Sequence, residues 1–420
     1  MIFYLALYFG LFGLIIRPCT KHSTFYTLIF IPSVWVLLEY IRGHLFTGFP
    51  WALLGYSQQL NLPAIQLADI TGAWGVSFLV MFINVAIVEI IWSIKNNLKD
   101  RFKITLILSI AVLVLSLGYG YFRITDKYVY NQKSGIMKIS VIQGNIPQEL
   151  KMDERYSGFT LAKYLKLSRL AAKDDPQMIV WPEAAAPGIL GEDDQIYEEI
   201  LSLAKEIKTP LLIGAVVKES DDYFGSALFI NASGAITRRY DKLHRVPFGE
   251  YIPLKNIFPF LEKVVPIGDI KKGKEYTIFP SGFAVLDCFE DVFPELAREF
   301  VKRGARFLVN ITNDAWYKET SAPWQHLQAS VFRAVENRVY LARAANTGVS
   351  GFIAPTGKII SLVRDKTGNS IFVDGFATQY IFMPESIRSF YTRYGDIFIL
   401  FCLIMALGGI IPQFLRKERK

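Results

Sequence analysis

The stretch FAVLDCFED, residues 283–291, places one cysteine where an apolar run meets a group of acids. The apolar run is typical of a buried β-strand, and Cys288 stands at its end, just before a predicted helix. A side chain at the end of a strand is exposed at the edge of a sheet, where binding and catalytic groups of α/β proteins collect. The stretch therefore predicts an α/β fold with Cys288 at a strand terminus.

The acids beside Cys288 bear on its chemistry. Asp287, Glu290 and Asp291 disfavour a thiolate, because nearby negative charge raises the pKa of a thiol. Strand alternation directs Asp287 to the opposite face, which weakens its effect. A nucleophilic Cys288 would still need a base and a positive charge from elsewhere in the chain. The alternative is a small buried apolar residue, which is the commoner role of a free cysteine.

Outward from this stretch, residues 137–373 have the composition of an α/β domain, in which strand-like runs alternate with amphipathic helical patterns. Strands are predicted over 137–144, 177–183, 210–217, 282–288, 305–313, 339–346 and 348–357, with a hairpin over 226–242. Helices are predicted over 159–172 and 195–207, and a third begins at Pro294 and ends at Gly304.

The segments on either side of this domain are strongly apolar. Residues 73–94 carry one acid and residues 104–122 carry no charge, and both are long enough to cross a bilayer as helices. Three further apolar segments, 1–16, 25–41 and 397–411, are shorter but of similar character. Four of the five fall close together and lack polar faces, so they predict a membrane bundle rather than buried helices of a soluble core.

This division predicts three domains. We expect an N-terminal transmembrane bundle of about four spans over residues 1–124, a catalytic domain over 137–375 and a C-terminal transmembrane helix over 394–413.

Membrane topology accounts for the net charge of +8. Basic residues gather in the link 95–103 and in the tail 416–420, and the positive-inside rule assigns both to the cytoplasmic side. The domain at 137–375 then lies outside, and nucleic acid is not expected as a partner. The same reasoning puts Met1 outside, and from this we expect that spans preceding it are lacking.

Cysteine and histidine usage predicts neither disulfides nor a metal site. The three cysteines are scattered, and the four histidines show no metal-ligand spacing. We therefore expect no metal.

Two residues at other predicted strand ends supply what Cys288 lacks. Glu183 follows Trp181 and Pro182, where partial desolvation would raise its pKa and make it a better base. Lys242 follows the hairpin and would stabilise an oxyanion. Taken singly, each has an ordinary interpretation, a surface acid and a solvated lysine. Together with Cys288 they form a set of base, cation and nucleophile.

The motifs around these residues resemble a known family. WPEAA (181–185), YDKLHRVPFGEYIP (240–253) and DCFED (287–291) resemble the Glu-Lys-Cys set of the nitrilase, or carbon–nitrogen hydrolase, superfamily. With the flanking spans they resemble its membrane branch, the apolipoprotein N-acyltransferases. Further matching stretches are 34–58, 313–326 and 343–357, so the resemblance covers nearly the whole chain. PFGEYIP together with NDAW and PWQH is far more specific than any single residue.

The resemblance implies a nitrilase-like four-layer α-β-β-α sandwich inserted between transmembrane helices of the bacterial inner membrane, with the catalytic domain on the periplasmic side. It also implies a ping-pong reaction without a cofactor. A phospholipid, typically phosphatidylethanolamine, would give its acyl chain to the cysteine as a thioester. The N-terminal amine of a diacylglyceryl-cysteine on an apolipoprotein would then take that chain, which is the last step of bacterial lipoprotein maturation.

The family's catalytic roles carry over to matching positions. Cys288 would be the nucleophile, Glu183 the general base and Lys242 the group that stabilises the oxyanion. Glu250 would orient the lysine or the incoming amine, and Glu290 would support the pocket.

Two aromatic residues and one apolar segment are also candidates for the site. Phe289 stands where the family commonly has a tyrosine, which puts any role of that hydroxyl in doubt. Trp324 either lines the acyl pocket or fills the core. The apolar segment 254–266 is expected to form a lid that dips into the membrane, with ordinary domain core as the alternative.

Other functions remain open at the level of sequence. A membrane-tethered amidase or nitrilase acting on small amides would use the same triad. A transporter or scaffold would keep its function without Cys288. A catalytically inactive relative is the third alternative, because the resemblance leads us to expect about three further spans before residue 1, although the complete triad argues against it.

Overall fold

The computed structural model describes residues 2–17, 24–125, 135–151, 153–253, 269–383, 385 and 389–417. The chain divides into two compact units. The helical unit comprises Met1–Asp126 and Arg388–Lys420, and the sandwich unit comprises Lys127–Ile387. The predicted lid, residues 254–266, lies outside the described residues.

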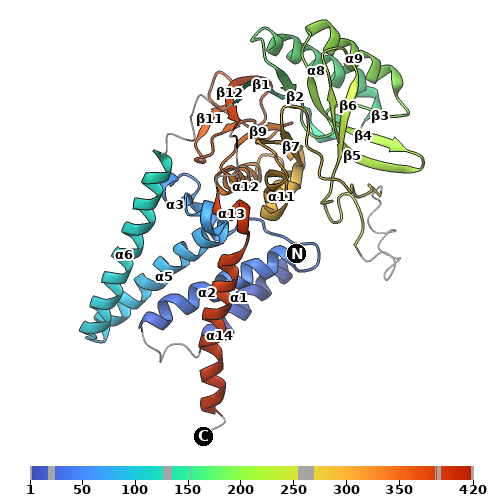
Figure 1. Ribbon diagram of the computed structural model, residues 1–420. Helices are drawn as coiled ribbons and strands as arrows, with labels where there is room; N and C mark the ends of the chain where they lie inside the picture. The colour runs from blue at the N-terminus through green and yellow to red at the C-terminus, as the bar shows by residue number, and fades with distance from the viewer. Residues whose placement is uncertain are drawn as a thin grey trace. The chain divides into compact units, whose positions relative to one another are not determined.

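The helical unit is built from long apolar helices joined by short ones (Figure 1). Its elements are α1 (Ile2–Ile16), α2 (Thr24–His44), η2 (Leu54–Gln58), α3 (Leu62–Ile65), α4 (Ala68–Thr71), α5 (Ala73–Lys95), α6 (Lys99–Ile124), α13 (Phe390–Tyr394) and α14 (Ile397–Lys417). Within the part of the chain that the structure describes, α5 and α6 are long and apolar enough to cross a membrane, while α1 and the stretch Ile397–Gly408 are shorter apolar helices. The expected number of spans therefore stays a prediction.

Helix α2 is central to this unit, because it packs against α5 and α14. Phe30, Val34 and Leu38 of α2 form one apolar cluster with Ala406 of α14, and Leu28 joins another with α5. These contacts bring together helices from the two ends of the chain.

Polar bonds add to this packing at the start of α14. Asp396 accepts hydrogen bonds from Trp74 Nε1 at 2.9 Å and from the Tyr391 hydroxyl at 3.1 Å. The first of these bonds joins residues that are 322 positions apart in the sequence, so it ties α14 to the start of α5.

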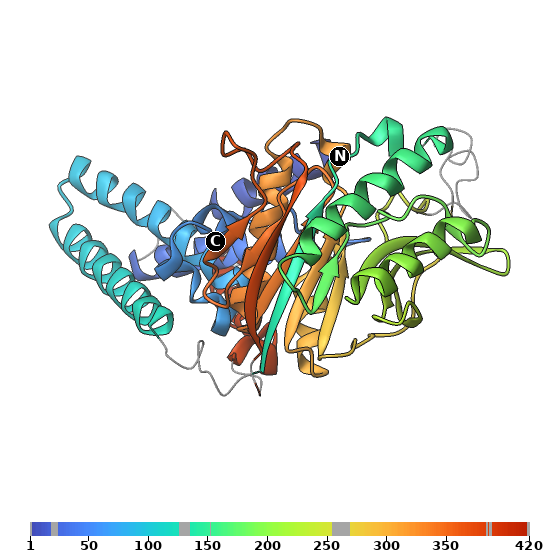
Figure 2. The same cartoon turned by 90° about the horizontal axis from the view of Figure 1, so that it is seen from above.

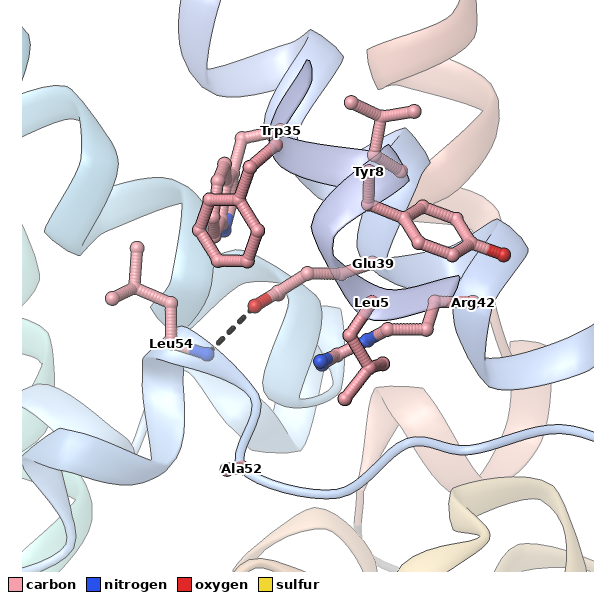
Figure 3. A pocket seen from close by; sticks show the side chains of 9 residues that line it. Leu5, Tyr8, Trp35, Glu39, Arg42, Ala52 and Leu54 are labelled. Atoms are coloured by element: carbon pink, nitrogen blue, oxygen red, sulfur yellow. Dashed lines mark hydrogen bonds between the residues drawn. The ribbon is translucent and has the colours of Figure 1, made fainter. Parts of the chain in front are cut away.

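Glu39, the acid within α2, is buried and has a local structural role. Its Oε1 accepts a hydrogen bond of 2.7 Å from the backbone N–H of Leu54, which ties the segment after α2 back to the helix (Figure 3). A cavity of about 250 Å³ lies beside this bond, lined by Leu5, Tyr8, Phe9, Trp35, Leu38, Glu39, Arg42, Ala52 and Leu54.

The sandwich unit contains two mixed sheets. The seven-stranded sheet has the order β12-β1-β2-β4-β5-β6, with β3 paired to β4, and the five-stranded sheet has the order β11-β10-β9-β8-β7. The first sheet consists of β1 (Gly135–Gln143), β2 (Met178–Val180), β3 (Ile189–Leu190), β4 (Leu211–Glu219), β5 (Asp222–Ile230), β6 (Ile236–Asp241) and β12 (Gly375–Met383). The second consists of β7 (Phe283–Asp287), β8 (Phe307–Thr312), β9 (Tyr340–Ala345), β10 (Gly351–Ile353) and β11 (Ile359–Leu362).

Helices cover the outer face of each sheet, which gives four layers (Figure 2). α8 (Ser157–Ala172) and α9 (Asp194–Ile207) pack on the first sheet, and α11 (Pro294–Lys302) and α12 (Ala322–Asn337) pack on the second. Short helical turns complete the unit: α7 (Gln148–Lys151), η4 (Glu154–Tyr156), η5 (Cys288–Val292) and η6 (Asp314–Tyr317). The predicted four-layer α-β-β-α sandwich is confirmed.

Parallel pairing positions the polar residues of the site. β1, β2 and β4 run parallel in one sheet, and β7, β8 and β9 run parallel in the other. Every residue of β7 and β8 is buried, as expected of parallel strands covered on both faces. The carboxyl ends of β7 and β8 lie side by side, with Asp287 opposite Ile311.

The structure differs from the predicted elements at several points. The strand expected over 177–183 spans only Met178–Val180, and the one expected over 348–357 spans only Gly351–Ile353. Helix α12 and the strands β11 and β12 are present in the structure but are not among the elements predicted from the sequence.

Strand β12 carries the sandwich past residue 375. It pairs antiparallel with β1 along its whole length, from Gln143 opposite Gly375 to Gly135 opposite Met383. The sequence pattern ends earlier, because most of β12 is only half-buried and lacks the continuous apolar run of the central strands.

Candidate active site

Cys288 begins a tight turn directly after β7. Its backbone φ is +54°, in the left-handed region that non-glycine residues rarely adopt, and the side chain is 8% exposed. The strand therefore ends at Asp287. Because Cys288 belongs to the turn η5, its side chain does not follow the alternation of side chains along β7. Strained backbone of this kind collects at functional sites.

Glu290 holds this turn in place. Its carboxylate accepts hydrogen bonds from the backbone N–H of Asp287 at 2.8 Å, of Leu243 at 2.6 Å and of His244 at 2.8 Å. The Tyr240 hydroxyl lies within hydrogen-bonding distance of both of its oxygens. One fully buried carboxylate thus joins the cysteine turn to the segment that carries Lys242.

The Lys242 ammonium lies between two carboxylates. Its Nζ is 3.1 Å from Glu183 Oε1 and 2.6 Å from Glu250 Oε1, and the lysine side chain is fully buried. The second oxygen of each acid accepts a hydrogen bond from a backbone N–H, that of Asn313 at 3.0 Å and that of Val246 at 2.8 Å. Glu183 is therefore fixed from both sheets, because Lys242 follows β6 and Asn313 follows β8.

Glu183 also acts electrostatically on the Cys288 thiol, because its negative charge raises the pKa of that thiol. The structure thus brings together the three residues predicted as base, cation and nucleophile, with Glu250 beside the lysine. Their catalytic roles stay predictions at this point, because proximity does not distinguish a base from a structural carboxylate.

The electrostatics of the three groups are linked. Burial raises the pKa of the Cys288 thiol, Glu183 raises it further and Lys242 opposes them, which leaves it well above its usual value. Burial lowers the pKa of Lys242, but Glu183 and Glu250 outweigh burial, so the lysine stays charged. The resting site therefore holds a neutral thiol beside an ion pair.

The expected rise in the pKa of Glu183 is wrong. Burial does raise it, but the positive charges of Lys242 and Lys151 outweigh burial and hold the pKa below its usual value. The sequence shows the desolvating neighbours Trp181 and Pro182, whereas the two lysines reach the carboxylate only through the fold.

The two aromatic candidates, Phe289 and Trp324, differ in burial and in their distance from the cysteine turn along the chain. Phe289 is buried in the turn, with its ring 5.3 Å from that of Phe293 and 6.5 Å from that of His244. Trp324 lies in the first turn of α12 and is 37% exposed. Among the described residues, no hydrogen bond, ion pair or ring contact joins Trp324 to the triad, and a role in substrate binding stays a prediction.

Two residues of the site are not among those predicted from the sequence. Lys151 of α7 donates a hydrogen bond of 2.8 Å to the backbone carbonyl of Glu183, and burial lowers its pKa to about 8. Thr312, the last residue of β8, places its hydroxyl 3.2 Å from Cys288 Sγ. Its position at a strand end resembles that of Glu183 and Cys288, and this was the one available signal.

A buried ionic network lies behind the nucleophile. His326 of α12 is 2.8 Å from both Asp291 and Asp314, and Arg343 of β9 contacts the same two acids at 2.9 Å and 3.1 Å. All four side chains are fully buried. Burial lowers the pKa of His326, but the two aspartates outweigh it and raise the value to about 9. The network therefore pairs two positive with two negative charges.

Comparison with known proteins agrees with this architecture. The carbon-nitrogen hydrolase family model matches residues 138–374, and the apolipoprotein N-acyltransferase N-terminal domain matches residues 1–86. A relative from Geobacter metallireducens, an apolipoprotein N-acyltransferase, is 39% identical over 100% of this chain and 80% of its own length. The chain belongs to the apolipoprotein N-acyltransferase family.

Another member of the family shows a similar extent of similarity. The apolipoprotein N-acyltransferase of Rickettsia typhi is 32% identical over 96% of this chain and 82% of its own length. Similarity of this extent shows apolipoprotein N-acyltransferase function, and together with the two membrane-capable helices it assigns the chain to a bacterial membrane. The family resemblance inferred from the motifs is confirmed.

The chain is also similar to a solved amidase structure. A mutant amidase from Nesterenkonia sp. AN1, with the acetamide moiety of fluoroacetamide added covalently at its active-site cysteine, is 18% identical. The similarity covers 64% of this chain and 97% of the amidase, with a TM-score of 0.46.

Proposed function

We propose that this protein transfers an acyl chain from a phospholipid to the N-terminal amine of a diacylglyceryl-cysteine on apolipoproteins, through a thioester on Cys288. The observation that carries the proposal is the grouping of Cys288, Glu183 and Lys242 at strand ends, in a chain of this family. The donor is a phospholipid of the phosphatidylethanolamine type, and the membrane supplies it.

The first half-reaction begins with proton transfer. Glu183 takes the thiol proton of Cys288, and the sulfur attacks the ester carbonyl of the phospholipid. The raised pKa of the thiol means that attack depends on this base. Negative charge develops on the carbonyl oxygen, and the buried Lys242 ammonium stabilises it. The intermediate collapses, the lysophospholipid leaves as an alcohol with the proton from Glu183, and the acyl chain stays on sulfur.

The second half-reaction repeats these steps with an amine. The neutral amine attacks the thioester carbonyl, Glu183 accepts its proton, and the Cys288 thiolate leaves and is reprotonated. The product is an amide, which is more stable than the thioester, so the transfer runs forward. Glu250 fixes the position of Lys242 for both steps, because its Oε1 lies 2.6 Å from the ammonium.

Intact-mass spectrometry tests the proposal. Purified protein incubated with phosphatidylethanolamine should gain the mass of one acyl chain, and Cys288→Ala should not. Hydroxylamine and a diacylglyceryl-cysteine peptide should both remove the added mass, and the peptide should gain it as an amide.

The alternative outcomes are informative. A folded, lipid-exposed protein without an adduct, or a Cys288→Ala variant that still acylates the peptide, would rule out the thioester mechanism. Release of short amides as free acids by the parent would favour the amidase instead.

A further inference from the structure

The Thr312 hydroxyl has two acceptors and one proton. It lies 3.2 Å from Cys288 Sγ and 3.1 Å from Asp314 Oδ1. A hydroxyl can donate only one hydrogen bond at a time, so Thr312 donates either to the sulfur or to Asp314. Thr312 is fully buried at the end of β8, where its carbonyl also accepts a hydrogen bond of 3.0 Å from Asn346 N–H.

Resting and ionised sulfur differ in how well they accept this hydrogen bond. A thiol sulfur is a weak acceptor, so the carboxylate of Asp314 is the better partner while Cys288 is protonated. A thiolate is charged, and hydrogen bonds to charged acceptors are roughly twice as strong as neutral ones.

Asp314 can release the hydroxyl at little cost. His326 Nδ1 lies 2.8 Å from its Oδ1, and Arg343 Nη2 lies 3.1 Å from its Oδ2. Both of its oxygens therefore keep a charged partner when Thr312 turns away. A buried carboxylate left without a partner would make the same rotation costly.

We propose that Thr312 is a further residue of the catalytic site, whose hydroxyl turns from Asp314 to Cys288 Sγ when the thiol is ionised and turns back when the thioester forms. No covalent bond to Thr312 is made or broken. The thiol proton goes to Glu183, and the threonine keeps its own proton. The inference rests on the proposed role of Cys288 as nucleophile.

The contact favours the thiolate over the other forms of the sulfur. It stabilises the attacking sulfur in the first half-reaction and the leaving sulfur in the second, whereas the thioester sulfur is neutral and gains little. This is the differential binding that accelerates a reaction. Other titratable groups act on Cys288 as well, and they are Glu183, Lys242, Asp314, Lys151 and Tyr317.

The test is the pH profile of Cys288 alkylation by iodoacetamide in the full-length protein, followed on the Cys288 peptide by mass spectrometry. Thr312→Val removes the hydroxyl at nearly constant shape. In this variant the midpoint of the alkylation profile should shift to higher pH. The alkylation rate at a fixed pH below the midpoint should fall about tenfold or more. Thr312→Ser should restore the parent profile.

A matched control and a second variant complete the design. Thr160→Val removes a buried hydroxyl in α8 and should leave the profile unchanged. Thr312→Ala should behave as Thr312→Val does, and it replaces that variant if valine prevents folding. A hydroxyl-free variant with the parent's profile would overturn the inference. The thioester mechanism has a separate test, because peptide acylation by Cys288→Ala would rule it out. Alkylation measures the reactivity of the thiol whether or not Cys288 is the nucleophile, so the two results are independent.

Discussion

His326 shows how a single residue in this fold makes stability depend on pH. Its imidazole lies between Asp291 and Asp314, and the pKa rises from 6.5 to about 9 in the folded protein. A histidine with a raised pKa in the folded state contributes stability below its unfolded pKa, and that contribution is lost as the pH rises through the folded value.

We expect the parent to lose stability between about pH 6.5 and about pH 9, by on the order of 3 kcal/mol from this residue. The unfolding temperature of His326→Gln should be lower overall but should lack this component of the pH dependence. His44→Gln, which replaces an exposed histidine of the helical unit, is the control. An equal pH dependence in parent and His326→Gln would contradict the assignment.

At the residue scale the sequence predicts which residues form the site better than it predicts their contacts and electrostatic surroundings. Glu183, Lys242 and Cys288 are recognisable because each is a chemical group of the right kind at a strand end. Thr312 also ends a strand, but its role and that of Lys151 depend on contacts between distant segments. The predicted direction of the Glu183 pKa shift is wrong for the same reason. The neighbouring residues in the sequence indicate burial, but they do not show the lysines whose charges outweigh it.

At the scale of elements, α8 supports the end of β2 that leads to Glu183. Trp181 is fully buried, its Nε1 donates a hydrogen bond of 2.8 Å to Ser168 Oγ of α8, and its ring stacks on Tyr164 with centroids 5.0 Å apart. The helix thereby fixes the residue two positions before the proposed base.

Ser168→Ala should lower the free energy of unfolding by about 1–2 kcal/mol, because it leaves the buried indole N–H without its acceptor. Chemical or thermal unfolding of the purified protein measures the change. Lys166→Ala on the exposed face of α8 should change stability by less than about 0.5 kcal/mol. If both variants unfold like the parent, the indole bond does not stabilise the fold.

Helix α12 shows why some elements are hard to predict from sequence. Its interior positions include His326, Arg333 and Glu336, all fully buried, so polar residues occur on the faces that pack inward. A buried helix with polar contacts has no clear apolar stripe, and periodicity therefore gives little signal. By contrast, α9 has an apolar face and a charged one, and its predicted bounds differ from the structure by one residue at the start.

At the scale of the whole molecule, charge distribution predicts orientation. We propose that the sandwich unit faces the periplasm and that the link between α5 and α6 faces the cytoplasm, because the helix ends on either side of that link carry Lys95, Lys99, Arg101 and Lys103. Orientation is independent of the catalytic proposal and can be measured separately.

Cysteine labelling measures this orientation. In a background with Cys19, Cys288 and Cys402 replaced by alanine, a membrane-impermeant maleimide should label Asp221→Cys, in the exposed turn between β4 and β5, in intact spheroplasts. Asn96→Cys, in the link after α5, should be labelled only after permeabilisation. The reverse pattern would show that the orientation is inverted.

The division of the site between two sheets has a consequence for the timing of reactivity. Glu183 and Lys242 follow strands of the seven-stranded sheet, whereas Cys288 follows β7 and Thr312 ends β8 in the five-stranded one. Until the two sheets close on each other, the sulfur has neither its base nor its cation, and it is an ordinary thiol. A chain still emerging from synthesis or crossing a membrane therefore carries no acylating centre, and chemical competence arrives together with the finished fold.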